Sequence, residues 1–179
     1  MITVYSLAND PLVLDLDHFI CAELEALNFH RALLNGLNFM KARFRHVDLR
    51  SAEMAATNLS NTRLDHCSLI LCVLQNANLT AAHLSGVRLN YANLQNANLE
   101  QIRMVDSFAM NANFQNANLA NANLGHTDVS RAVFRNANLQ GVNLSEAVLE
   151  EAEFEGALYN TATIWPDGFD PSSRGAIQL

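Results

Sequence analysis

Large apolar residues recur at nearly every fifth position of this chain, from Phe19 to Phe154. A smaller residue usually stands two places before each of them, as Ala92 does before Leu94. A period of five fits neither the repeat of an α-helix, about 3.6 residues, nor the two-residue alternation of a strand. It fits a short extended segment that points its small and large residues inward, followed by a two-residue turn. Repetition of this unit predicts a solenoid with one continuous core.

The outward positions indicate how many units close one coil. Steps of fifteen residues mix residue types, with Asn28 and Arg43 followed by Asn58 and Val73. Steps of twenty give one residue type throughout, namely Asn38, Asn58, Asn78, Asn98, Asn118 and Asn138. Stacked asparagines favour in-register pairing through their side-chain amides. We therefore predict four sides per coil and about seven coils over residues 17–164.

The recurring Ala-Asn-Leu, written twice in residues 92–99, resembles the A(D/N)Lxx consensus of the pentapeptide repeat family. The resemblance implies an all-β fold, a right-handed quadrilateral parallel β-helix. Residues 159–171 also resemble an end segment common in cyanobacterial members. Residues 1–16 and 165–179 fall outside the array, and we expect them to cap its two open ends.

The cap residues are expected to be apolar side chains that the repeat does not use. At the N-terminal end these are Leu12, Val13, Leu14 and Leu16. At the C-terminal end Trp165 and Phe169 are expected to plug the last coil. One central position departs from the pattern, since Ala109 is small. Either a cavity forms there or the neighbouring Phe108 shifts inward to fill it.

Composition narrows the class of protein. A length of 179 residues suits one domain, and a net charge of -7 disfavours nonspecific binding to nucleic acid. The start of the chain lacks the features of a signal peptide, and no apolar run is long enough to span a bilayer. We expect a cytoplasmic protein that binds neither nucleic acid nor membrane.

The three cysteines do not form a complete disulfide framework, because their number is odd. Cys67 and Cys72 occupy the small inward position on adjacent sides of one coil. We interpret them as buried small apolar residues, with a redox pair as the alternative. The chain carries no phosphate-binding loop, CxxC, HExxH or nucleophile-elbow motif, so we expect neither catalysis nor a cofactor.

One side of the predicted solenoid collects cationic and histidine side chains. This basic stripe consists of Arg43, Arg45, His46, Arg63, His66, His83 and Arg103. His46 and His66 lie twenty residues apart, so their rings could meet, but no third metal ligand is evident. Asp65 is expected to pair with Arg45 or Arg63. The stripe is either simply solvated or attracts an acidic partner surface.

The neighbouring side carries apolar residues at positions that the repeat points outward. This apolar patch consists of Ile70, Leu71, Val73, Tyr91, Phe108 and Met110. Contiguous exposed apolar area marks an interface more often than scattered single residues do. We predict a surface for a protein partner or for self-association, and partial cover by a terminal segment is the alternative.

These features favour a non-enzymatic interaction scaffold for an unknown protein partner. The alternative comes from the family resemblance, because some members mimic DNA and bind DNA gyrase. A mimic needs negative charge along its whole length, whereas the acids of this chain gather at its ends. They are Asp10, Asp15, Asp17, Glu23 and Glu25 near the start and Glu146, Glu150, Glu151, Glu153 and Glu155 near the end.

Overall fold

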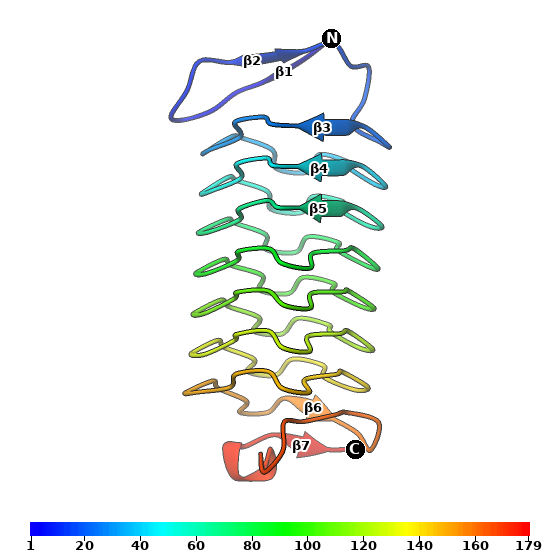
Figure 1. Cartoon of the computed structure of the whole chain (residues 1–179), viewed down its shortest axis with the longest axis vertical. Helices are drawn as coiled ribbons and strands as arrows, with labels where there is room; N and C mark the ends of the chain where they lie inside the picture. Colours follow the sequence, from blue (N-terminus) through cyan, green and yellow to red (C-terminus); the bar gives the residue numbers. More distant parts are fainter.

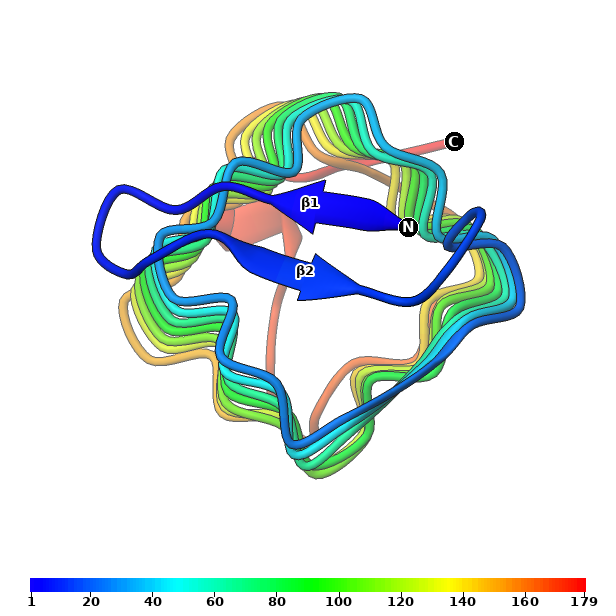
Figure 2. The same cartoon turned by 90° about the horizontal axis from the view of Figure 1, so that it is seen from above.

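The computed structural model describes all 179 residues as one rod of stacked coils (Figure 1). Three parallel strands, β3 (Glu23–Glu25), β4 (Arg43–Arg45) and β5 (Arg63–Asp65), form a sheet along one side. Single parallel bridges continue the pairing on all sides, from Asn28 with Asp48 to Asn138 with Leu158, each joining residues twenty apart. The twenty-residue period is therefore confirmed, and a view along the rod shows a four-cornered outline (Figure 2).

The corners of the coils lie two residues after each large inward residue. There, 24 residues other than glycine have positive φ, including Asn96 at +57° and His126 at +56°. Gly36 and Gly141, at φ +70° and +67°, occupy the same position, where glycine carries no steric penalty. Most corners close with a bond such as that from the Ala97 N–H to the Leu94 carbonyl, 3.1 Å long. This confirms the predicted turn positions.

The asparagine column stabilises the corners as well as the stack. The side-chain oxygen of Asn98 accepts a hydrogen bond from the backbone N–H of Glu100 at 3.2 Å. The same bond recurs at Asn118 and Asn138, so each asparagine stabilises its own turn. Amide-to-amide bonds of 3.2 and 3.0 Å also link Asn98 to Asn118 and Asn118 to Asn138. The local turn bond gives these outward positions their preference for asparagine.

The core is one cluster of 52 buried residues along the axis. Phe114, Phe134 and Phe154 stack in successive coils, with ring centroids 4.9 and 5.2 Å apart. Ala109 is fully buried, whereas Phe108 is 49% exposed, so Phe108 does not turn inward to fill the position. The next inward residue of that coil, Phe114, is larger than Leu94 one coil earlier.

An antiparallel hairpin of β1 (Ile2–Val4) and β2 (Leu12–Leu14) lies across the N-terminal end of the rod (Figures 1 and 2). Val4 is buried, and Leu12, Leu14 and Leu16 pack partly buried against the core. Val13 is 59% exposed and does not cover the coil, since alternate residues of a strand point to opposite faces.

At the other end, β6 (Leu158–Tyr159) pairs in parallel with β7 (Ile177–Gln178), and a short 3₁₀ helix η1 (Ser172–Arg174) precedes β7. The rings of Trp165 and Phe169 pack edge-on against Phe154, at 5.4 and 5.5 Å between centroids. Ile164 bridges Asn143, which is a step of 21 residues, so the repeat gains one residue in its last side. No helix of this structure is long and apolar enough to cross a bilayer.

Candidate interaction surfaces

Four residues of the basic stripe form one column of the solenoid. Parallel pairing places Arg43 beside Arg63, Arg63 beside His83, and His83 beside Arg103. Arg45 lies between Glu25 and Asp65 on the neighbouring strands. Only Arg43 of this set has an ion pair, to Glu23 at 3.7 Å between exposed side chains. Most of the cationic groups therefore remain free to meet an external anion.

His46 and His66 stack at one corner, with ring centroids 5.1 Å apart and planes within 6° of parallel. Surface hollows of about 380 and 300 Å³ flank the pair, and both histidines line both hollows. Asp65 makes no ion pair with Arg45 or Arg63, contrary to the expectation, although parallel pairing sets Arg45 directly beside Asp65. No three potential metal ligands come together.

The side next to the basic stripe, with Asp48, Ser68, Arg88 and Phe108 in one column, carries two further arginines, Arg50 and Arg88. Arg50 donates two hydrogen bonds to the Asp48 carboxylate, at 2.9 and 2.6 Å. The hydrogen bond from Arg50 holds the pKa of Asp48 below its ordinary value. Arg88, which lines the smaller hollow together with both histidines, has no such partner. On the side that carries Asp48 and Phe108, the free positive charge is therefore that of Arg88, beside the histidine corner.

The apolar patch lies next to that charge. Leu71, Tyr91 and Phe108 are 55%, 57% and 49% exposed, and Ile70, Val73 and Met110 are half-buried. Leu71 and Tyr91 occupy the same corner of successive coils, and the Tyr91 N–H donates to the Met110 carbonyl at 2.9 Å. Arg88 bridges Phe108 in the next coil, so the apolar patch and the basic side share a border. Their exposure shows that neither terminal segment covers these rings.

Leu71 and Tyr91 are unusual residue types for the backbone conformation of a corner. Both have φ of +61°, the left-handed conformation in which a β-carbon crowds the following carbonyl. Asparagine tolerates this conformation and fills seven other corners: Asn61, Asn76, Asn96, Asn111, Asn116, Asn121 and Asn136. Neither burial nor backbone geometry favours a large apolar residue at Leu71 or Tyr91.

The cysteines fit a packing role. Cys67 and Cys72 are buried free thiols, and Cys21 is exposed. Burial raises the pKa of Cys67 to about 11, and burial also raises the pKa of Cys72. A thiol that stays protonated near neutral pH is a poor nucleophile, which supports their interpretation as core residues.

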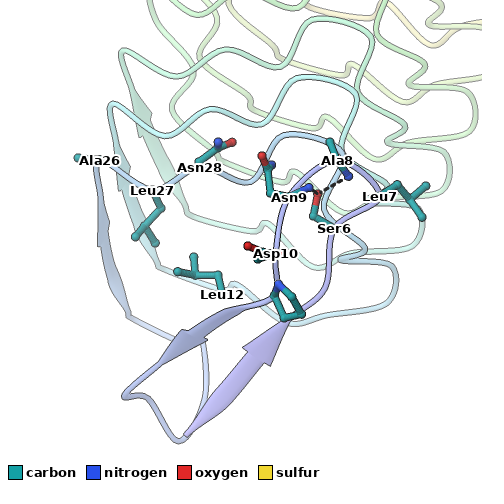
Figure 3. Close-up of a pocket in the computed structure, with 10 residues that line it drawn as sticks. Ser6, Leu7, Ala8, Asn9, Asp10, Leu12, Ala26, Leu27 and Asn28 are labelled. Atoms are coloured by element: carbon teal, nitrogen blue, oxygen red, sulfur yellow. Dashed lines mark hydrogen bonds between the residues drawn. The ribbon is translucent and has the colours of Figure 1, made fainter.

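The largest hollow, about 720 Å³, lies at the N-terminal end and was not predicted from the sequence (Figure 3). Residues 6–12 line one side of it and residues 26–28 line the other. No spacing pattern joins these two segments, because residues 6–12 lie outside the repeat. The one local feature of residues 6–12 that points to a binding surface is Leu7, an apolar residue that is 60% exposed.

Several solved structures resemble the chain at low sequence identity. HetL, a pentapeptide repeat protein involved in heterocyst differentiation regulation in the cyanobacterium Nostoc sp. strain PCC 7120, is 20% identical, with 87% of this chain and 82% of HetL covered and a TM-score of 0.41. Rfr23 from the cyanobacterium Cyanothece 51142 is 26% identical, with 80% and 84% covered and a TM-score of 0.36. QnrB1, a plasmid-mediated fluoroquinolone resistance protein, is 15% identical in one structure, with 93% and 88% covered and a TM-score of 0.41.

No protein of curated function matches the chain. The family model for pentapeptide repeats matches eight copies, within residues 22–61, 52–90, 67–106, 112–150 and 127–157. These ranges cover most of the chain and coincide with the coils that stack at twenty-residue intervals. The inward residues, the positive-φ corners and the matched repeats agree, and the chain belongs to the pentapeptide repeat family.

Proposed function

We propose that this protein is a non-catalytic interaction scaffold of the cytoplasm that binds a partner protein through the apolar patch. The observation that carries the proposal is the pair of corners at Leu71 and Tyr91, where exposed apolar side chains occupy left-handed backbone positions. These half-exposed side chains contribute little to the free energy of folding, whereas an interface would bury their remaining exposed area and be stabilised by it. The proposal includes a right-handed coil of about seven turns as the rigid support of the patch.

The charge around the patch indicates the kind of partner. Residues 37–144 carry nine Lys and Arg against six Asp and Glu, so the middle of the rod is net positive although the chain is acidic. Arg88 lies directly beside Phe108. A partner with an apolar centre and an acidic rim would match both features. A second copy of this chain is the alternative occupant of the patch.

The distribution of charge argues against mimicry of DNA toward gyrase. Duplex DNA presents negative charge at regular spacing along its axis, and a mimic replaces that charge. Here the central coils are net positive, and twelve of the 18 acids lie at the two ends, in residues 1–36 and 145–179. We expect no inhibition of gyrase supercoiling at micromolar protein, and inhibition at that concentration would favour the DNA-mimic function instead.

The test of the scaffold function compares the wild-type protein with the double variant Tyr91→Asp and Phe108→Asp. The control is Val13→Asp, since Val13 is as exposed as these residues but lies in the N-terminal hairpin. Proteins retained from the native cell extract are identified by mass spectrometry, and oligomeric state is measured by sedimentation. We expect wild type and control to share a binding partner or a dimer that the double variant loses. Equal retention and equal sedimentation for all three proteins would contradict the proposal.

A further inference from the structure

The first coil of the solenoid leaves hydrogen-bonding groups without a partner. In later coils, each outward residue bonds back to the coil before it. The Asp48 N–H donates to the Leu27 carbonyl at 3.0 Å, and the Asp48 carbonyl accepts from the Phe29 N–H at 2.8 Å. Asn28 is the equivalent residue of the first coil, and its backbone N–H and carbonyl make no bond within the chain. This segment is an open sheet edge of the kind that pairs with an added strand.

On the neighbouring side of the same coil, the corresponding edge already pairs with an extended segment. There the chain supplies its own strand, because Ser6 bridges Ala32 in an antiparallel arrangement. The Leu33 N–H donates to the Tyr5 carbonyl at 2.8 Å, and the Leu7 N–H donates to the Arg31 carbonyl at 3.0 Å. After Leu7 the chain leaves the edge and returns through β2. The edge at Asn28 remains unpaired.

A groove of about 720 Å³ lies over that unpaired edge (Figure 3). Its apolar lining comes from Leu7, Leu12 and Leu27, and its polar lining includes Asn9 and Asp10. Leu12 and Leu27 are partly buried against the core, so they form the inner wall. A strand placed beside Asn28 would direct alternate side chains toward this inner wall and the others toward solvent.

The charge at this end selects the chemistry of the added strand. Residues 1–36 carry five Asp and Glu against one Arg. Asp10 lines the groove and makes no ion pair. Because acidic side chains at a groove attract cations, the outward residues of a bound strand would be Lys or Arg.

We propose that this groove binds an extended basic peptide, which pairs as a strand with the backbone of Asn28. Its apolar side chains face Leu12 and Leu27, and an alternating Lys or Arg side chain faces Asp10. The site is separate from the apolar patch on the side of the rod. A second copy is disfavoured as the occupant, because residues 145–179 at the opposite end carry seven acids against one Arg. Two acidic ends of neighbouring copies would repel each other.

The test uses two proline variants of the full chain. Asn28→Pro removes an N–H that no atom of the chain uses, and its ring blocks the approach of a strand. Asn38→Pro is the matched control, because its N–H is also unused at the same end of the rod but lies outside the groove. Each asparagine accepts one hydrogen bond, from His30 or Met40, both 3.0 Å long, so both variants lose the same turn bond.

The probe is a blocked peptide of alternating lysine and valine, titrated by calorimetry at low salt, with a glutamate–valine peptide as the charge control. We expect the lysine peptide to bind wild type and Asn38→Pro equally, and Asn28→Pro roughly fivefold or more weakly, from the loss of edge pairing. Asp10→Asn is a second variant that leaves the backbone intact, and we expect weaker binding to it at low salt.

Three results would overturn the proposal. One is that the lysine peptide does not bind the wild-type protein. Another is that Asn28→Pro, shown to be folded by its unfolding curve, binds as Asn38→Pro does. If Asn28→Pro does not fold, the proposal is instead overturned when Asp10→Asn binds the lysine peptide as tightly as the wild-type protein does. The third is a dimer in sedimentation that Asn28→Pro abolishes, which would assign the groove to a second copy instead.

Discussion

Replacement of Leu71 by Asn tests whether the apolar corners serve folding or contact. Leu71 is 55% exposed, so less than half of its side chain is removed from water in the folded protein. Complete burial of a leucine contributes roughly 1.5–3 kcal/mol, and its partial burial here contributes about 1 kcal/mol. Asparagine relieves the left-handed strain at φ +61°, which costs a branched or bulky residue about 1–2 kcal/mol. The two effects nearly cancel.

We therefore expect Leu71→Asn to change the free energy of unfolding by no more than about 1 kcal/mol, and in the stabilising direction if at all. The matched control is Leu69→Ala, two residues earlier in the same unit, because Leu69 is fully buried. Truncation of a buried leucine costs about 2–5 kcal/mol. The two variants compare the contribution to stability of an outward corner residue with that of an inward core residue in the same repeat.

Urea unfolding followed by far-ultraviolet circular dichroism measures both variants. With a slope of about 2 kcal/mol per molar urea, the control should lower the midpoint by more than about 1 M, while Leu71→Asn should leave it nearly unchanged. If Leu71→Asn destabilises the protein as much as Leu69→Ala does, Leu71 is part of the folded packing. Folding stability alone would then explain why Leu71 is apolar, and the scaffold proposal would lose its main observation.

Two further predictions concern the core. Leu94→Asp places a carboxylate at a fully buried position, and we expect it to unfold the array, since an unpaired buried charge costs several kcal/mol. A melting curve close to that of wild type would contradict the inward assignment. In the folded protein at pH 8 we expect a thiol reagent to modify only Cys21, because burial raises the pKa of Cys67 and Cys72 above the ordinary value. All three should react in urea, and rapid native modification of Cys72 would refute its burial.

Much of the repeat could be predicted because its information is local. Each unit carries its own inward Leu or Phe, its own small residue and its own corner, so the five-residue spacing indicates the turn without knowledge of distant contacts. The asparagine column of Asn58, Asn78 and Asn98 added the coil length, since only a step of twenty aligns it. The residues of the apolar patch followed from the same register, as outward positions with apolar side chains.

The local pattern failed where contacts depend on more than the register. It placed Asp65 near Arg45 and Arg63, and the parallel register does set Arg45 beside Asp65, but none of the three makes an ion pair. It left open whether Phe108 would turn inward beside Ala109, and in the structure Phe108 stays half exposed. Both outcomes depend on how neighbouring coils fill space.

The amino-acid sequence alone was enough to establish a five-residue unit, a twenty-residue coil and the identity of the inward and outward sides. These follow from short-range sterics and burial, which each repeat satisfies again with its own residues. Tertiary structure decided what happens at the ends, where residues 1–16 have no repeat to constrain them. The pairing of Ser6 with Ala32 and the open edge at Asn28 arise from a contact between segments with unrelated patterns. The course of that cap over the first coil follows from the packing of Val4, Leu12 and Leu14 on the core, which no sequence spacing encodes.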